Sequence, residues 1–180
     1  HKYAPLSDVQ RAIRLVRSMG YEKVATLGFS AGGHLCCTSG TLYGFEAYPK
    51  TDAIDELSAR PDAFMPCYPV VTFTEPFTHM GSRQNLLGEE WNDMELVHMF
   101  SNEENVTPDT PPCFIWHTAN DGCVPIENAL MLAGALAKNK VYFETHIYPD
   151  GCHGLGLATG KNDVSCWTNN AVIFLKNLGF

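Results

Sequence analysis

Basic residues are scarce in this sequence, and long hydrophobic runs are absent. Lys and Arg total 12 of 180 residues against 20 Asp and Glu, so the formal net charge is −8. The basic residues form no cluster, which argues against nucleic acid or an anionic membrane surface as a partner. No apolar run reaches the roughly 20 residues that span a bilayer. We therefore expect neither a nucleic-acid nor a membrane partner.

Patterns typical of metal sites and disulfide frameworks are also lacking. The 7 cysteines include no Cys-x-x-Cys motif, so a structural zinc site has little support, and we predict no metal and no cofactor. An odd number of cysteines without paired spacing is typical of free thiols, which predicts a cytoplasmic location. The chain opens at His1 rather than Met, so a targeting segment upstream stays open.

The sequence does contain enough apolar residues for a core. Hydrophobic residues make up 45% and charged residues 18%, which predicts one globular domain over residues 1–180. Short apolar runs indicate buried strands, and two prolines in the second run, Pro66 and Pro69, favour an edge strand or a bulge there. The runs cover residues 24–29, 63–71, 113–117 and 141–148.

Helical patterns alternate with these runs. Ser7 and Gln10 fit a capping box that would begin the first helix, and Gly20 sits where it would end. Buried strands alternating with helices predict an α/β fold with a mostly parallel sheet. The segment at about residues 72–112 is too long for a plain connection, and such insertions are usually functional loops, which predicts a lid-like region. The other predicted helices run from Ala31 to about Tyr43, from Pro125 to about Asn139, and from Val164 to Leu178.

The stretch GFSAGGHL, residues 28–35, joins a predicted strand to a predicted helix. Its Gly-x-Ser-x-Gly pattern is typical of a nucleophile on a sharp turn, and we expect Gly28 and Gly32 to be required because a Cβ would collide there. The N–H of Ala31, at the helix start, would point at a developing oxyanion. The alternative is a glycine-rich turn in which Ser30 is incidental.

A serine nucleophile needs a base, and the base needs a carboxylate that orients it. Asp121 follows the third predicted strand, and His153 follows the fourth. Both therefore fall at the carboxyl edge of the sheet, where Ser30 also lies, and their order along the chain fits this chemistry. We predict the triad Ser30, Asp121 and His153.

Other residues are weaker candidates. Asp150 is near His153, but Pro149-Asp150-Gly151 is ordinary turn chemistry. Asp109 precedes its strand and falls at the wrong edge. His117 is interpreted as a hydrogen-bonded core residue, and His34 as a support for the turn. Three further histidines have no metal-like spacing: His79, His98 and His146. Cys123 and Cys152 flank Asp121 and His153. The first interpretation of each is a small buried side chain, and the alternatives are a position lining the pocket and, with less support, a regulatory disulfide.

Four stretches together resemble the acetyl xylan esterase-like branch of the α/β-hydrolase superfamily: GFSAGGHL, PFTHMGSRQNLLGEE, TPPCFIWHTANDGCVPIENAL and HIYPDGCHGLGLA. The likeness runs over nearly the whole chain. It implies a serine esterase acting on a small-molecule ester, either a short acyl ester or an acetylated sugar. It also implies that the neighbourhood of Gly81, Ser82 and Arg83 lies at the pocket mouth and binds substrate.

The sequence departs from this family at its start. Relatives carry earlier strands and a His-Gly-Gly loop that supplies a second oxyanion donor, so we expect an α/β-hydrolase fold that lacks its N-terminal strands. The free edge of the first predicted strand should then pair with a separate N-terminal segment or with another copy in a homo-oligomer. Two alternatives to an esterase stay open: a prolyl-oligopeptidase-like peptidase, and a catalytically silent fragment or binding scaffold.

Overall fold

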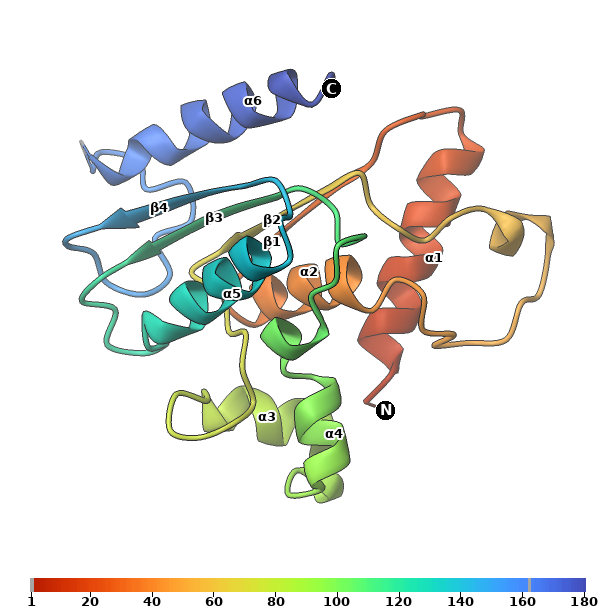
Figure 1. Ribbon diagram of the computed structural model, residues 1–180, viewed down its shortest axis with the longest axis horizontal. Coiled ribbons are helices and arrows are strands. Elements are labelled where there is room, and N and C mark those ends of the chain that lie inside the picture. Colours follow the sequence, from red (N-terminus) through yellow and green to blue (C-terminus); the bar gives the residue numbers. More distant parts are fainter. Residues whose placement is uncertain (1, 162) are drawn as a thin grey trace.

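The computed structural model describes residues 2–161 and 163–180 and is built on a parallel sheet (Figure 1). Its strands lie in the order β1 (Ala25–Phe29), β2 (Ala63–Cys67), β3 (Cys113–Thr118) and β4 (Phe143–Tyr148). Every neighbouring pair is parallel. The carboxyl ends of all four strands therefore meet at one edge, as the alternation of strands and helices predicts.

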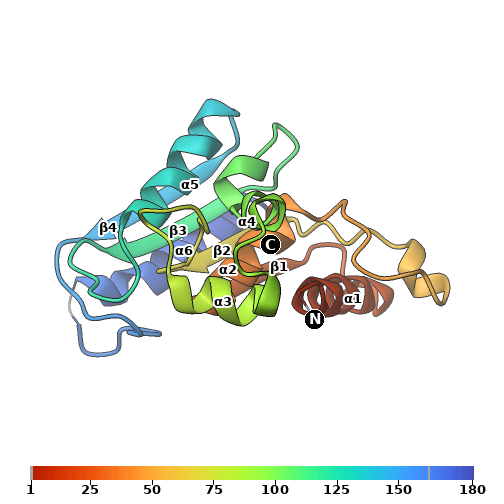
Figure 2. The same cartoon turned by 90° about the horizontal axis from the view of Figure 1, so that it is seen from below.

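Helices cover both faces of this sheet. Helices α2 (Ala31–Thr41) and α5 (Glu127–Lys138) lie on one face, and α6 (Trp167–Asn177) lies on the other (Figures 1 and 2). Each face has its own apolar core: Phe64 and Ile115 point toward α2 and α5, while Trp116 packs against α6. Burial of both faces explains why β2 and β3 read as continuous apolar runs.

Two strands of the sheet correct the sequence interpretation. We expected the run at 24–29 to be a buried strand, but β1 is half-exposed and Leu27 is 45% exposed, because β1 pairs only with β2 among the described residues. We also expected Pro66 to mark an edge or a bulge, but β2 lies between β1 and β3 and is fully buried. Phe64 and Tyr68 donate their N–H groups to β3 or its flank, so Pro66 removes only one bond between them.

Helix α1 (Ala4–Ser18) begins earlier than predicted. Pro5 occupies its first turn, a position that favours helix initiation, so the proposed capping box at Ser7 is wrong. The side chain of Gln10 instead donates to the carbonyl of Phe45, 2.7 Å away. Gly20 has φ of +92° directly after the helix, which confirms it as the stop signal.

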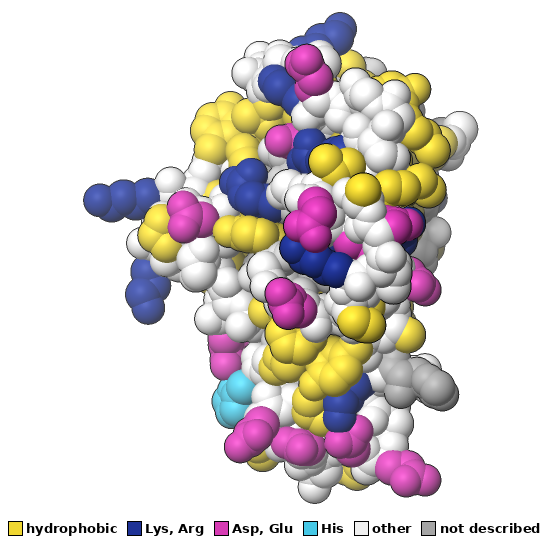
Figure 3. Space-filling view, turned by 90° about the vertical axis from the view of Figure 1, so that its right-hand side faces the viewer, with side chains coloured by type: hydrophobic (Ala, Val, Ile, Leu, Met, Phe, Trp, Pro, Cys, Tyr) yellow, Lys and Arg dark blue, Asp and Glu magenta, His cyan; other side chains and the backbone are white. Residues whose placement is uncertain are grey.

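Ion pairs fasten α1 to the loop after α2. Arg11 pairs with Asp52 and with the buried Asp55, near the short 3₁₀ helix η1 (Ala53–Glu56), and Arg17 pairs with Asp62. On the face that Figure 3 shows, basic and acidic side chains lie interspersed with hydrophobic ones. This agrees with the absence of a basic cluster in the sequence.

The insertion at about residues 72–112 folds into short helices rather than an open loop. It contains α3 (Met80–Leu87), η2 (Gly88–Glu90), α4 (Met94–Met99) and η3 (Asn102–Asn105). Phe73, Leu87 and Phe100 build a small core there together with Val124 from the segment after β3. The insertion therefore packs onto the segment that carries Asp121.

The remaining predicted helix is divided, since η4 (Val164–Cys166) precedes α6. Among the described residues, none of the helices combines the length and apolar character needed to cross a membrane.

Candidate active site

Ser30 is the single residue between the end of β1 and the start of α2. Its backbone adopts a conformation that is rare for residues other than glycine. Its φ is +56° and its ψ is −117°. The turn is held by a bond from the Ser30 N–H to the carbonyl of Cys67 at 3.1 Å, while His34 and Val70 donate to the Ser30 carbonyl. Such a conformation costs about 1–3 kcal/mol and persists only where the surrounding structure over-determines it, as these bonds do here.

The glycine positions around Ser30 differ in whether they leave room for a side chain. A Cβ on Gly28 would lie 2.0 Å from the Gly32 carbonyl oxygen, and a Cβ on Gly33 would lie 2.8 Å from Pro69. Both positions therefore exclude a side chain. A Cβ on Gly32 would meet nothing within 4 Å, so the expectation that Gly32 is sterically required is wrong for the described residues.

The three predicted triad residues lie together at the carboxyl edge of the sheet. Ser30 Oγ is 2.7 Å from Nε2 of His153, and Nδ1 of His153 is 2.7 Å from Oδ2 of Asp121. Asp121 follows β3, His153 follows β4, and Ser30 follows β1. The parallel sheet brings together residues that are far apart in sequence because its strands end at one edge.

The carboxylate of Asp121 is enclosed by donors. Its side chain is 1% exposed, and its Oδ1 accepts the N–H groups of Cys123 at 2.8 Å and Val124 at 3.1 Å. Burial raises the pKa of Asp121, but the bonds from His153 and from these two N–H groups outweigh it, so the pKa is lowered overall. Asp121 is therefore ionised and orients Nδ1–H of His153 toward itself, which leaves Nε2 to face Ser30.

His117 makes a second contact with this carboxylate that the sequence did not reveal. It is a buried core residue as predicted, and its Nε2 lies 3.1 Å from the Val124 carbonyl and 3.3 Å from Oδ2 of Asp121. Burial lowers the pKa of His117, so the ring is neutral and Nε2–H is the donor. In the sequence, the only sign of this contact was that His117 and Asp121 lie four residues apart at the end of β3.

Tyr68 is another neighbour of the predicted triad, and the sequence did not single it out. It follows β2 with φ of +36°, and its ring meets the His153 ring edge-on at 5.0 Å between centroids. Its hydroxyl accepts the N–H of Gly156 at 3.0 Å, which ties the loop after His153 to the sheet. Asp150, the alternative acid, instead accepts a bond from Asn120 at 2.8 Å.

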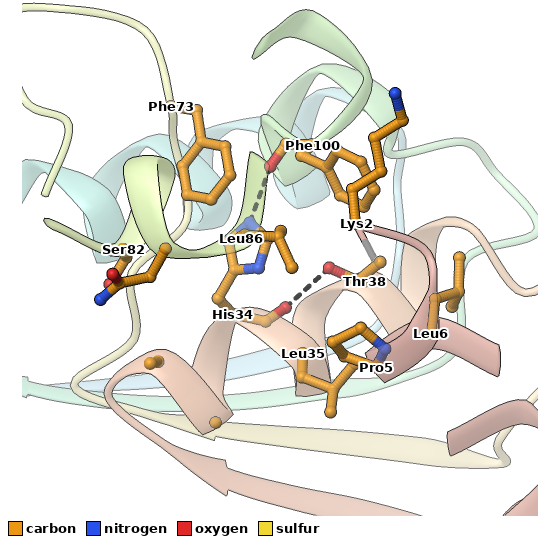
Figure 4. Close-up of a pocket in the computed structure, with 13 residues that line it drawn as sticks. Lys2, Pro5, Leu6, His34, Leu35, Thr38, Phe73, Ser82, Leu86 and Phe100 are labelled. Carbon is orange, nitrogen blue, oxygen red and sulfur yellow. Dashed lines mark hydrogen bonds between the residues drawn. The ribbon is translucent and has the colours of Figure 1, made fainter. Parts of the chain in front are cut away.

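A cavity of about 390 Å³ opens beside Ala31 (Figure 4). Ala31 is exposed and is the first residue of α2, so its N–H has no acceptor within the helix. His34 lies in the cavity wall, stacked on Phe73 at 4.4 Å, and its Nε2 is directed at the Phe100 carbonyl. The backbone N–H of His34 donates to the carbonyl of Ser30, which agrees with the prediction that His34 supports the turn.

The three residues predicted to bind substrate lie in different surroundings. Ser82 lines the cavity beside Ala31, and Gly81 is exposed next to it. The side chain of Arg83 is buried and donates to the carbonyls of Trp91 and Phe73, so it braces the insertion. Contact of these three residues with substrate stays a prediction.

Cys123 and Cys152 are both exposed, so the interpretation of these cysteines as small buried side chains is wrong. They line an open hollow of about 550 Å³ together with His153. Sγ of Cys123 lies 3.7 Å from Nε2 of His79, which stands just before α3. Among the residues that the structure describes, no group of three or more His, Cys, Asp or Glu side chains could hold a metal ion.

Comparisons with known proteins place the chain among related sequences. The BD-FAE family model matches residues 3–136. Endo-1,4-beta-xylanase B of Butyrivibrio fibrisolvens is 38% identical over 87% of this chain and 25% of its own length. The acetylxylan esterase of Xylanibacter ruminicola is 30% identical over 86% of this chain and 32% of its own length.

Solved structures have the same fold. The acetyl ester-xyloside bifunctional hydrolase of Caldicellulosiruptor lactoaceticus superimposes with a TM-score of 0.90 at 44% identity, over 98% of this chain and 66% of that chain. The chain thus spans about a quarter to two thirds of the length of these relatives. The matched family model, the relatives and the fold show that this chain belongs to the BD-FAE family, within the acetyl xylan esterase-like branch of the α/β-hydrolases.

Proposed function

We propose that the protein is a serine hydrolase that cleaves carboxylic esters, with short acyl esters or acetylated sugars as substrates. The observation that carries this proposal is the chain of two 2.7 Å contacts from Ser30 through His153 to Asp121, at a serine with positive φ. A serine hydroxyl is a weak nucleophile at neutral pH, and this arrangement supplies both the base and the group that orients it.

In the proposed reaction, Oγ of Ser30 attacks the ester carbonyl while Nε2 of His153 takes its proton. Asp121 stabilises the imidazolium that forms. The N–H of Ala31 donates to the oxyanion of the tetrahedral intermediate. His153 then gives the proton to the departing alcohol, leaving an acyl group on Ser30, and a water activated by the same histidine releases the acid. This chemistry requires no metal or cofactor.

The relatives favour acetyl esters of carbohydrates as the substrate class, since two of them are an acetylxylan esterase and an acetyl ester-xyloside hydrolase. We place the ester beside Ser30, between the cavity that Ala31 and Ser82 line and the hollow that His153 lines. Residues 72–112 would act as a lid-like wall of this site, because they carry Ser82 and pack beside the Asp121 segment.

The test combines turnover with active-site labelling. The protein and its Ser30→Ala variant would be assayed for acetate release from acetylated xylo-oligosaccharides and from p-nitrophenyl acetate, with a prolyl-peptide substrate in parallel. A fluorophosphonate followed by intact-mass measurement should add one adduct to the protein and none to the variant. Faster cleavage of the peptide would favour a peptidase. Absence of both labelling and turnover would favour a silent binding scaffold and refute the proposal.

A further inference from the structure

A cysteine, a histidine and a serine form a second chain of polar contacts beside the triad. Sγ of Cys123 is 3.7 Å from Nε2 of His79, and Nδ1 of His79 is 2.9 Å from Oγ of Ser82. The N–H of Ser82 also donates to Nδ1 of His79, at 3.2 Å. These contacts join the start of α3 to the loop that carries Asp121, and the proposed ester hydrolysis does not use them.

The contacts of His79 decide which ring nitrogen carries the proton. Nδ1 accepts the backbone N–H of Ser82, so the neutral ring has its proton on Nε2. That N–H faces the sulfur of Cys123. A donor at the sulfur stabilises negative charge on it, and the thiolate is the form that attacks disulfides.

Cys123 differs from the thiols of the core. Cys36, Cys37, Cys67 and Cys113 are buried, and burial raises the pKa of each of them, to about 11 for Cys36. Buried thiols of this kind are inert. Cys123 is exposed and opens into the hollow of about 550 Å³ that His153 also lines. A group attached to this sulfur would therefore occupy space next to the catalytic histidine.

We propose that Cys123 is a modification site at which a low-molecular-weight disulfide forms a mixed disulfide and blocks the active site. The Cys123 sulfur forms a new S–S bond with one sulfur of the small disulfide. The original S–S bond breaks, and its other half leaves as a thiol that takes up the proton Cys123 released. Reduction by a thiol reverses the step. The blocking effect rests on the proposed function, whereas the modification itself does not.

The modification is measured with cystamine as the probe and peptide mass spectrometry as the readout. The extent of adduct at each exposed cysteine is followed over time, with Cys152 and Cys166 as internal comparisons. We expect Cys123 to react at least about tenfold faster than either of them. Equal rates at the three sites, or an internal Cys123–Cys152 disulfide in place of the adduct, would overturn the proposal.

The role of His79 is tested by a variant that keeps the helix start intact. Asn is a good N-cap residue, so His79→Asn preserves an acceptor for the Ser82 N–H while it removes the N–H that faces the sulfur. We expect it to slow cystamine addition at Cys123 about tenfold. His98→Asn, at an exposed histidine paired with Glu104, is the matched control and should react at the normal rate. An equal effect of both variants would refute the role of His79.

The consequence for catalysis is measured separately, as the ratio of treated to untreated p-nitrophenyl acetate hydrolysis within each variant. Cystamine should lower this ratio to less than about one tenth in the wild type and in Cys152→Ser, and dithiothreitol should restore it. Cys123→Ser should keep a ratio near one. Full activity of protein that carries the adduct would overturn the blocking effect. If untreated protein hydrolyses no ester, the proposed function fails, while the mass measurement still decides on the modification.

Discussion

Acid should destabilise this protein in part through one buried histidine, His34. Its ring is buried and stacked on Phe73, and its Nε2 lies 2.8 Å from the Phe100 carbonyl. Burial lowers the pKa of His34 from 6.5 to about 4, and the bond to the Phe100 carbonyl only partly offsets this. The unfolded chain therefore takes up this proton first as the pH falls.

The size of the effect follows from linkage. Because the folded pKa lies below the unfolded value, stability is fully present above pH 6.5 and is lost as the pH falls toward 4. Each unit of difference between the folded and unfolded pKa values corresponds to about 1.36 kcal/mol, so the complete loss of folding free energy is about 3 kcal/mol. Between pH 7 and pH 5 the expected loss from His34 is about 2 kcal/mol.

Urea unfolding followed by tryptophan fluorescence at pH 7 and pH 5 measures this loss. His34→Gln can still donate to the Phe100 carbonyl but does not titrate, so its free energy of unfolding should fall about 2 kcal/mol less than that of the wild type between the two pH values. His98→Gln, at an exposed histidine, is the control and should follow the wild type. Equal losses in the wild type and in His34→Gln would refute the reasoning.

Three further predictions concern the site. Asp121→Asn should lower kcat/KM for p-nitrophenyl acetate by about 10⁴-fold, whereas Asp150→Asn should lower it less than about tenfold; the reverse order would show that the wrong acid was chosen. His117→Phe should reduce kcat by about 10- to 100-fold with little change in KM, because only the position of Asp121 is disturbed; an unchanged kcat would exclude this positioning role. Gly28→Ala should destabilise the fold by more than about 4 kcal/mol in thermal melts, whereas Gly32→Ala, with open space at its Cβ, should change stability little; equal melting temperatures would contradict the steric argument.

Several features of the fold could be predicted because they depend on neighbours in the chain. The turn at Ser30 is one, since its Gly-x-Ser-x-Gly pattern is local and a Cβ on Gly28 would meet the carbonyl of Gly32, four positions along the chain. The meeting of Asp121 and His153 with Ser30 was also predictable, because parallel strands end at one edge and each residue directly follows a strand. The alternation of strands and helices was sufficient to predict a parallel sheet.

Other features were decided only by contacts between distant segments. Pro66 was interpreted as a sign of an edge strand, yet β2 is a central strand. The proline is tolerated there because Phe64 and Tyr68, on either side of it, still donate their N–H groups to β3 or its flank. The contact of His79 with Cys123 joins residues 44 positions apart, and no local period encodes it. The same holds for the edge-on ring of Tyr68 against His153. Local sequence thus determined which residues could do the chemistry, and tertiary packing decided which side chains surround them, because burial and hydrogen-bond partners are properties of the folded chain as a whole.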